Sequence, residues 1–148
     1  MLSTTCKYAV RALIYIGMKG SEENRANARI IANELGIPMQ FLSKILQIFV
    51  RKGLLKSVKG PTGGFFLARK PEEITLYDIV KIIDGPGFFE TCLIGTGLCQ
   101  SSTNKIERCP VHDRFSAVRE QVVNYFKSEN IKGIIERMGH DERILLKL

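Results

Sequence analysis

Three of the four cysteines and one of the two histidines lie within residues 92–112, a stretch otherwise rich in Gly, Ser, Thr and Asn. Cys92, Cys99, Cys109 and His112 supply three thiols and one imidazole, which are ligands for zinc and for iron–sulfur clusters. The same thiols can exchange disulfides. Six residues separate the first two cysteines and nine separate the next two. This spacing alone leaves open a metal site, a disulfide loop or an accident of composition.

The length of 148 residues corresponds to about one domain with a real core. The sequence contains no run of about 18 apolar residues, so we expect no membrane-spanning helix. The N-terminus also lacks the layout of a signal peptide. We therefore expect a cytoplasmic protein, in which cysteines are more often ligands, sensors or core residues than disulfides. Cys6, in an apolar N-terminal segment, is expected to be a small core residue.

The positive charge of the chain is concentrated in its first half. Residues 1–75 hold 12 Lys and Arg residues against 5 Asp and Glu residues, whereas residues 76–148 hold 10 of each. The entire net charge of +7 therefore lies in the first half. Such a bias favours a nucleic acid or an anionic membrane surface as partner, and a solvated basic face is the alternative.

Two short helices joined by a tight turn are predicted within that basic half. The segment ARIIANEL follows Asn27, a good N-cap, and ends at Gly36, a natural stop. A second helix begins at Pro38 and closes at Gly53, with an apolar repeat at Phe41, Leu42, Ile45, Leu46 and Phe49. Its outer side is polar and partly basic, so the pair predicts a helix-turn-helix.

A β-hairpin is predicted directly after the second helix. Residues 55–58 and 65–67 are short strand candidates around the tip KGPTGG. We expect Gly63 and Gly64 to take positive φ there, while Pro61 stiffens the tip. A hairpin in this position is a wing, so the order of elements predicts a winged helix-turn-helix.

Two longer helices are predicted in the second half, besides a short helix over IKGIIERM and a polar tail at the end of the chain. Thr75 and Asp78 nearly form a capping box before one of them. The other spans 113–129, about four turns, with apolar residues at near-heptad spacing: Phe115, Val118, Val122, Tyr125 and Phe126. Packing of this seam against a second copy and packing against the core are equally compatible with the pattern. The chain divides into a DNA-binding domain (1–86), a cysteine-rich loop (87–112) and a dimerisation helix with a tail (113–148). The fold class is mainly α.

A winged helix lays its second helix in the major groove of duplex DNA, and its wing contacts the backbone or minor groove. Gln40 and Ser43 are then placed to read base edges, and Lys44 to reach guanine or a phosphate. The remaining candidate DNA contacts are Lys52, Lys59, Thr62 and Gly63, the last two through backbone amides. A solvated helix face is the alternative for the lysines of the helix. Neutralising about six phosphates predicts a slope of roughly −5 for log K against log salt.

No catalytic motif accompanies these features. The chain has no P-loop, no G-x-S-x-G elbow and no HExxH, and KGPTGG lies in a hairpin rather than between a strand and a helix. We therefore do not expect an enzyme.

The segments STTCKYAVRALIYI, IANELGIPMQFLSKILQIFVRKGLLKSVKGPTGGFFLAR and ITLYDIVKIIDG, followed by a cysteine loop, resemble the IscR-type family of bacterial transcription regulators. That family also includes NsrR and CymR. The resemblance reaches to about residue 135. It implies a dimeric repressor or activator that binds near-palindromic duplex DNA, has no membrane partner, and in cluster-binding members holds iron–sulfur through three loop cysteines and a fourth ligand.

Carried over position by position, Cys92, Cys99, Cys109 and His112 match the cluster ligands of the family. Some relatives use a carboxylate of the first helix as the fourth ligand, and Lys7 stands at that position here. The resemblance therefore favours His112 and a [2Fe–2S] cluster that responds to iron–sulfur or redox status. Zinc, a thiol switch without metal, and a loop that binds nothing are the alternatives. If the loop binds nothing, a partner protein or a small ligand would control DNA binding.

Overall fold

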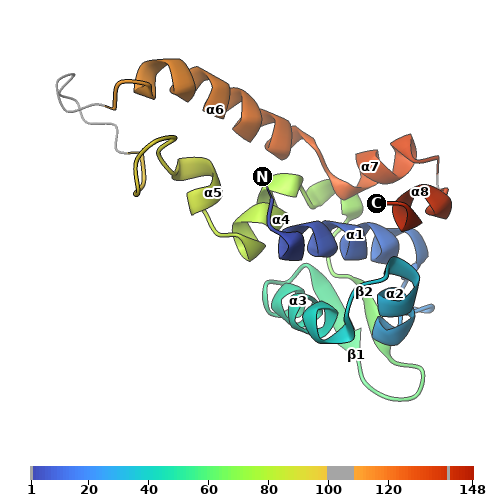
Figure 1. Ribbon diagram of the computed structural model, residues 1–148. Coiled ribbons are helices and arrows are strands. Elements are labelled where there is room, and N and C mark those ends of the chain that lie inside the picture. Colours follow the sequence, from blue (N-terminus) through green and yellow to red (C-terminus); the bar gives the residue numbers. More distant parts are fainter. Residues whose placement is uncertain (1, 100–108, 140) are drawn as a thin grey trace.

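The computed structural model describes residues 2–99, 109–139 and 141–148, so the whole segment between Cys99 and Cys109 lies outside the described residues. Helix α1 (Thr4–Lys19) runs through the middle of the fold and contacts α2, α3, α4, α7, α8 and strand β2 (Figure 1). Ser3 caps α1 by accepting from the Cys6 amide. The helix is apolar almost all round because other elements cover most of its faces. Cys6 is fully buried in it, as predicted.

Helices α2 (Ala28–Leu35) and α3 (Met39–Arg51) form the predicted helix-turn-helix. The Asn27 side chain accepts from the Arg29 amide, and Gly36 ends α2 in the left-handed conformation at φ 62°. Arg11 of α1 donates to the Leu35 carbonyl at 2.8 Å, which places a cation at the negative end of the α2 dipole. Arg11 of α1 therefore anchors the turn between the two helices.

The inward face of α3 consists of Leu42, Ile45, Leu46 and Phe49, all buried. Phe41 was predicted to join this face, and that prediction is wrong: its side chain is 44% exposed. Phe41 lies at the edge of the apolar stripe, where the helical period alone does not decide whether a neighbouring element covers a side chain.

The wing consists of β1 (Leu55–Val58) and β2 (Gly64–Leu67), antiparallel with Leu55 opposite Leu67 and Val58 opposite Gly64. The positive φ at the tip falls on Gly60, at 114°, and not on Gly63 or Gly64 as predicted. Those two glycines are instead needed for close packing. A Cβ on Gly64 would lie 2.7 Å from the Ala26 carbonyl oxygen.

Residues that precede α2 extend the wing on its second side. The amide of Ala26 donates to the Phe65 carbonyl, and the amide of Phe65 donates back to Ala26, both at 2.9 Å. The polar connection before α2 therefore behaves as a short third strand. This pairing fixes the wing relative to the start of α2.

A short 3-10 turn (Pro71–Glu73) leads from the wing to α4 (Leu76–Ile83) and α5 (Gly87–Glu90). The predicted capping box at Thr75 and Asp78 is present. At the other end of α4, the Ser3 amide donates to the Asp84 carboxylate at 3.1 Å, and the Ser3 hydroxyl donates to it as well. The start of α1 and the end of α4 are thus joined.

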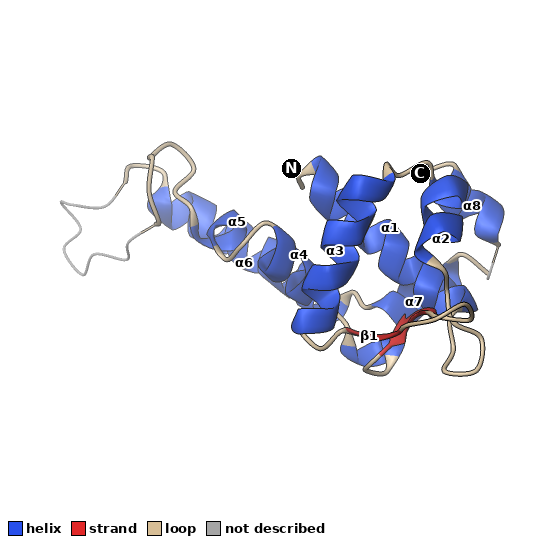
Figure 2. Ribbon diagram, turned by 90° about the horizontal axis from the view of Figure 1, so that it is seen from below, coloured by secondary structure: helices blue, strands red, loops and turns tan. Residues whose placement is uncertain are grey.

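The second half contributes α6 (His112–Ser128), α7 (Ile131–Arg137) and α8 (Glu142–Leu146). Helix α6 lies along the outside against α4, while α7 and α8 return to α1 (Figures 1 and 2). Lys19 joins α8 to the DNA-binding half through ion pairs with Glu142 at 2.6 Å and Glu34 at 3.2 Å. The mainly helical fold with a two-stranded wing is as predicted. None of the helices that the structure describes is both long and apolar enough to cross a membrane.

Candidate nucleic-acid interface and cysteine loop

The outward face of α3 carries the predicted recognition residues. Gln40 and Lys44 are exposed, and Ser43 is half-buried one turn after Met39. Lys52 is exposed at the C-cap of α3 and follows the exposed Arg51. These positions share the face opposite the buried stripe, so the helix presents polar and cationic groups to solvent along its whole length.

No acidic residue falls between Glu34 and Glu72, the stretch that contains α3 and the wing. Seven cationic residues occupy the same stretch: Lys44, Arg51, Lys52, Lys56, Lys59, Arg69 and Lys70. Such a one-sided surface attracts the phosphates of a nucleic acid at long range.

Lys59 and Thr62 are exposed at the tip of the wing. The amide of Gly63 was expected to face a phosphate, but it donates to the Gly60 carbonyl at 2.9 Å and closes the turn. Gly63 therefore shapes the tip. Arg25 reaches the Thr62 carbonyl with its guanidinium at 3.4 Å. Sequence reasoning missed Arg25, because only the pairing of Ala26 with β2 brings it to the wing.

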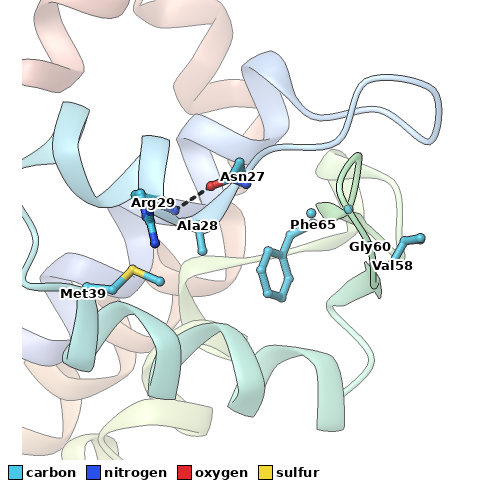
Figure 3. Close-up of a pocket in the computed structure, with 9 residues that line it drawn as sticks. Asn27, Ala28, Arg29, Met39, Val58, Gly60 and Phe65 are labelled. Carbon is cyan, nitrogen blue, oxygen red and sulfur yellow. Dashed lines mark hydrogen bonds between the residues drawn. The ribbon is translucent and has the colours of Figure 1, made fainter.

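A hollow of about 390 Å³ lies between the start of α2, the start of α3 and the wing (Figure 3). In the close-up, Met39 and Arg29 stand on the side of the two helices, and Phe65, Val58 and Gly60 on the side of the wing. A second hollow of about 480 Å³ lies beside α3 and the wing and shares Val58 and Phe65 with the first. The groove between recognition helix and wing is thus open and partly apolar.

Replacing Gly63 with alanine is expected to weaken DNA binding about tenfold through the wing. The new Cβ would lie 2.3 Å from the Val58 carbonyl oxygen, far below any real contact, so the tip must rearrange. Gly133→Ala is the matched control, because its added Cβ meets only ordinary contacts at 3.5 and 3.6 Å and lies outside both the wing and the cysteine loop. Electrophoretic mobility shift at one salt concentration measures both. Unchanged affinity in Gly63→Ala would mean that the wing does not contact DNA.

The cysteine region begins as a small hairpin. Thr91 bridges Leu98, the Cys92 amide donates to Gly97 at 2.9 Å, and the Cys99 amide donates to Glu90 at 2.6 Å. The Cys99 Sγ lies 3.0 Å from Nδ1 of His112, the first residue of α6. Two of the predicted ligands are therefore in direct contact, although twelve residues lie between them in the chain.

The other two predicted ligands adjoin this pair. Hydrogen bonds from the amides of Ile94 and Gly95 lower the pKa of the Cys92 thiol, and the neighbouring Cys109 and Cys99 thiols lower it further. Within the described part of the chain, however, no three His, Cys, Asp or Glu side chains are set out as ligands of one metal ion. The thiols adjoin one another without closing around a common centre.

Cys6 has the opposite environment. Burial raises the pKa of its thiol to about 12, and the Asp84 carboxylate adds to this effect. A thiol with so high a pKa is inert at neutral pH. Thiol chemistry at neutral pH therefore rests with Cys92, Cys99 and Cys109. The described segments that carry them, residues 91–99 and 109–112, lie at the end of the molecule away from the wing (Figures 1 and 2).

Comparison with known proteins agrees with this architecture. The family model "Rrf2: Iron-dependent Transcriptional regulator" matches residues 2–137. A putative HTH-type transcriptional regulator of Aquifex aeolicus is 32% identical over 135 residues, covering 91% of each chain.

Two solved structures share the fold at 20% identity. CymR, the global cysteine regulator of B. subtilis, superposes with a TM-score of 0.75 over 93% of this chain and 97% of its own. IscR of T. potens superposes with a TM-score of 0.70 over 93% and 87%. The chain therefore belongs to the Rrf2 family, and it is a DNA-binding transcription regulator and not an enzyme.

Proposed function

We propose that the chain is a cytoplasmic homodimer that regulates transcription from near-palindromic sites and senses iron–sulfur or redox status through its cysteine loop. The observation that carries the sensing role is the contact of Cys99 with His112 at the first residue of α6, with Cys92 and Cys109 adjoining. The description of the family as iron-dependent supports an effector that contains iron.

The donor set suits a [2Fe–2S] cluster, because three thiols and one imidazole are ligands that such clusters accept. Cys92, Cys99, Cys109 and His112 would hold it. When bound, the cluster supplies one-electron redox chemistry. Lys7 is exposed on α1 and carries no carboxylate, so the first helix offers no ligand at that position.

This proposal assigns a separate role to each part of the chain. Residues 1–86 bind DNA, residues 87–112 sense, and α6 within residues 113–148 joins two copies. Gln40 and Ser43 read base edges in the major groove, and Lys44 contacts guanine or a phosphate. Lys52, Lys59 and Thr62 contact the backbone.

The exposed side of α6 supports the dimer. Val118, Val122 and Tyr125 are 51%, 39% and 57% exposed on this helix. Phe126 packs inward, with its ring centroid 5.8 and 5.4 Å from those of Phe88 and Phe89, and Val122 lies at the border between this inner side and the exposed one. The inner side of α6 is therefore satisfied within one chain, whereas its outer apolar side is suited to a second α6.

Helix α6 also connects the loop with the DNA-binding half. It starts at His112, and its far end is tied to α4 through the Leu76 amide, which donates to Glu129 at 2.9 Å. The Ile131 amide donates to Ile74 at 3.0 Å in the same junction. A change at the loop would shift α6 and so alter the spacing of the two recognition helices. This regulation requires that the two states of the loop differ in free energy by a few kcal/mol.

Anaerobic purification followed by iron and acid-labile sulfide analysis tests the cluster. Cys99→Ser is expected to lose iron, sulfide and visible absorbance together, because a hydroxyl replaces the thiolate that adjoins His112. Cys6→Ala is the matched control and keeps them, since Cys6 lies in the core. A wild-type protein without iron and sulfide after anaerobic purification would rule the cluster out.

A thiol switch is the second candidate, favoured by the adjacency of Cys92 to both other loop thiols. Two thiols would each lose a proton and together two electrons to an oxidant, forming one disulfide. Mass spectrometry of the oxidised, iron-free protein identifies this outcome. Zinc without sulfide in the purified protein would indicate a structural site instead.

A further inference from the structure

An apolar side chain stands at the start of the recognition helix, where polar and cationic groups otherwise dominate. Met39 is the first residue of α3 and is 45% exposed. It lines the hollow together with Val58, which is 39% exposed, and Phe65 (Figure 3). Exposure of a methionine here leaves apolar surface in water, so the surface is suited to a partner that covers it.

The surroundings of Met39 limit the chemistry of that partner. Arg29 lines the same hollow, Gln40 follows Met39 directly, and Lys44 is exposed further along α3. The acidic residues that flank α3 and the wing in the sequence are Glu34 and Glu72, and none lies between them. A polyanion with apolar groups on its surface matches this combination of charges and apolar atoms, and duplex DNA is such a partner.

Duplex DNA presents one apolar group on its base edges in the major groove, the C5 methyl group of thymine. Met39 lies at the end of α3 that reaches the bases in a winged helix. We propose that Met39 determines sequence specificity by packing its thioether against a thymine methyl group. This inference rests on the proposed binding of specific sites, and it adds an apolar readout to the polar readout by Gln40 and Ser43.

Met39 and Phe41, both exposed apolar residues of α3, lie on different sides of the helix. Met39 faces the wing and the start of α2, as the lining of the hollow shows. Phe41 does not line that hollow and lies on the opposite flank of the helix, two residues on. Methionine is unbranched and adaptable, so it can follow the position of a methyl group in the groove. Val58 and Phe65 of the wing line the side of the hollow opposite Met39.

The test uses the full chain and a duplex selected by the wild-type protein from a random pool. Each thymine of that duplex is then replaced by deoxyuridine, which removes the methyl group and nothing else. Dissociation constants are measured for the wild type, Met39→Ala, Met39→Leu and the control Ile144→Ala. Ile144 is an exposed apolar residue of α8, away from α3 and the wing.

At one or more positions, deoxyuridine should weaken wild-type binding about three- to fivefold, the value of one buried methyl-sized group. Met39→Ala should bind thymine and deoxyuridine duplexes equally, while Met39→Leu and Ile144→Ala retain the discrimination. Wild-type binding that ignores deoxyuridine at every position overturns the inference, and so does full discrimination by Met39→Ala. Failure to select any duplex overturns the proposed function itself, and the inference falls with it.

Discussion

Replacing Phe49 with alanine should destabilise the protein by about 3–5 kcal/mol, the usual loss for a buried phenylalanine. Phe49 is fully buried on α3, and its carbonyl accepts from the Leu54 amide at 2.9 Å where the helix turns into the wing. The cavity would lie at the junction of α3 with α1 and β1. Since small domains have only about 5–15 kcal/mol of total stability, this loss should lower the midpoint of thermal unfolding by more than about 10 °C.

Phe41→Ala is the matched control for this substitution. It removes the same side chain from the same helix, but at a position that is 44% exposed. It should change the free energy of unfolding by no more than about 0.5 kcal/mol, the usual range for surface positions. Urea denaturation followed by circular dichroism measures both variants. Equal losses of stability in the two variants would contradict the packing of α3 described above.

Placing a charge on the outer face of α6 should dissociate the proposed dimer. In Val122→Glu, two carboxylates would be buried without partners near the twofold axis, because Val118 and Tyr125 surround the position. Light scattering should then give the mass of one 16.7 kDa chain instead of two. Affinity for a two-half-site duplex should fall about 10²-fold, since each half-site is then bound independently.

Asn124→Glu adds the same charge to the same helix on a different side, where Asn124 lines a hollow beside Cys99 and His112. It should leave the mass of the dimer unchanged. If Val122→Glu also stays dimeric, the interface lies elsewhere and the outer face of α6 has another role.

Most elements of the fold follow from local signals in the sequence. Asn27, Gly36 and the Thr75–Asp78 box mark helix ends because their side chains or backbone freedom satisfy the exposed amides and carbonyls of a terminus. The helix-turn-helix and wing were therefore predictable from short stretches. The buried stripe of α3 was predictable except at its edge, where Phe41 depends on whether a neighbour covers it.

The features that the sequence did not reveal depend on contacts between distant segments. The pairing of Ala26 with Phe65 brings Arg25 to the wing, and nothing local to residues 24–27 signals a strand. The positive φ at Gly60 depends on the register of the hairpin, which places Val58 opposite Gly64. These positions are settled by tertiary packing and not by propensity.

The cysteine loop was predictable in composition but not in geometry. Residue types alone suggested ligands, and the family resemblance selected His112 among them. The contact of Cys99 with His112 arises because α6 begins at His112 and Arg119 of the same helix donates to the Thr91 carbonyl at 3.3 Å. Loop spacing carries no such information, since long loops close at small extra entropy.

Regulation through the loop is tested most directly by one comparison at constant salt. The dissociation constant for the selected duplex is measured anaerobically with protein that retains iron and sulfide, and again after chelation has removed them. A coupling of about 1–3 kcal/mol between loop and recognition helices predicts that the two constants differ about 5- to 150-fold. Identical dissociation constants for the two forms would contradict sensing through a cluster in the loop, even if both forms bind the duplex tightly.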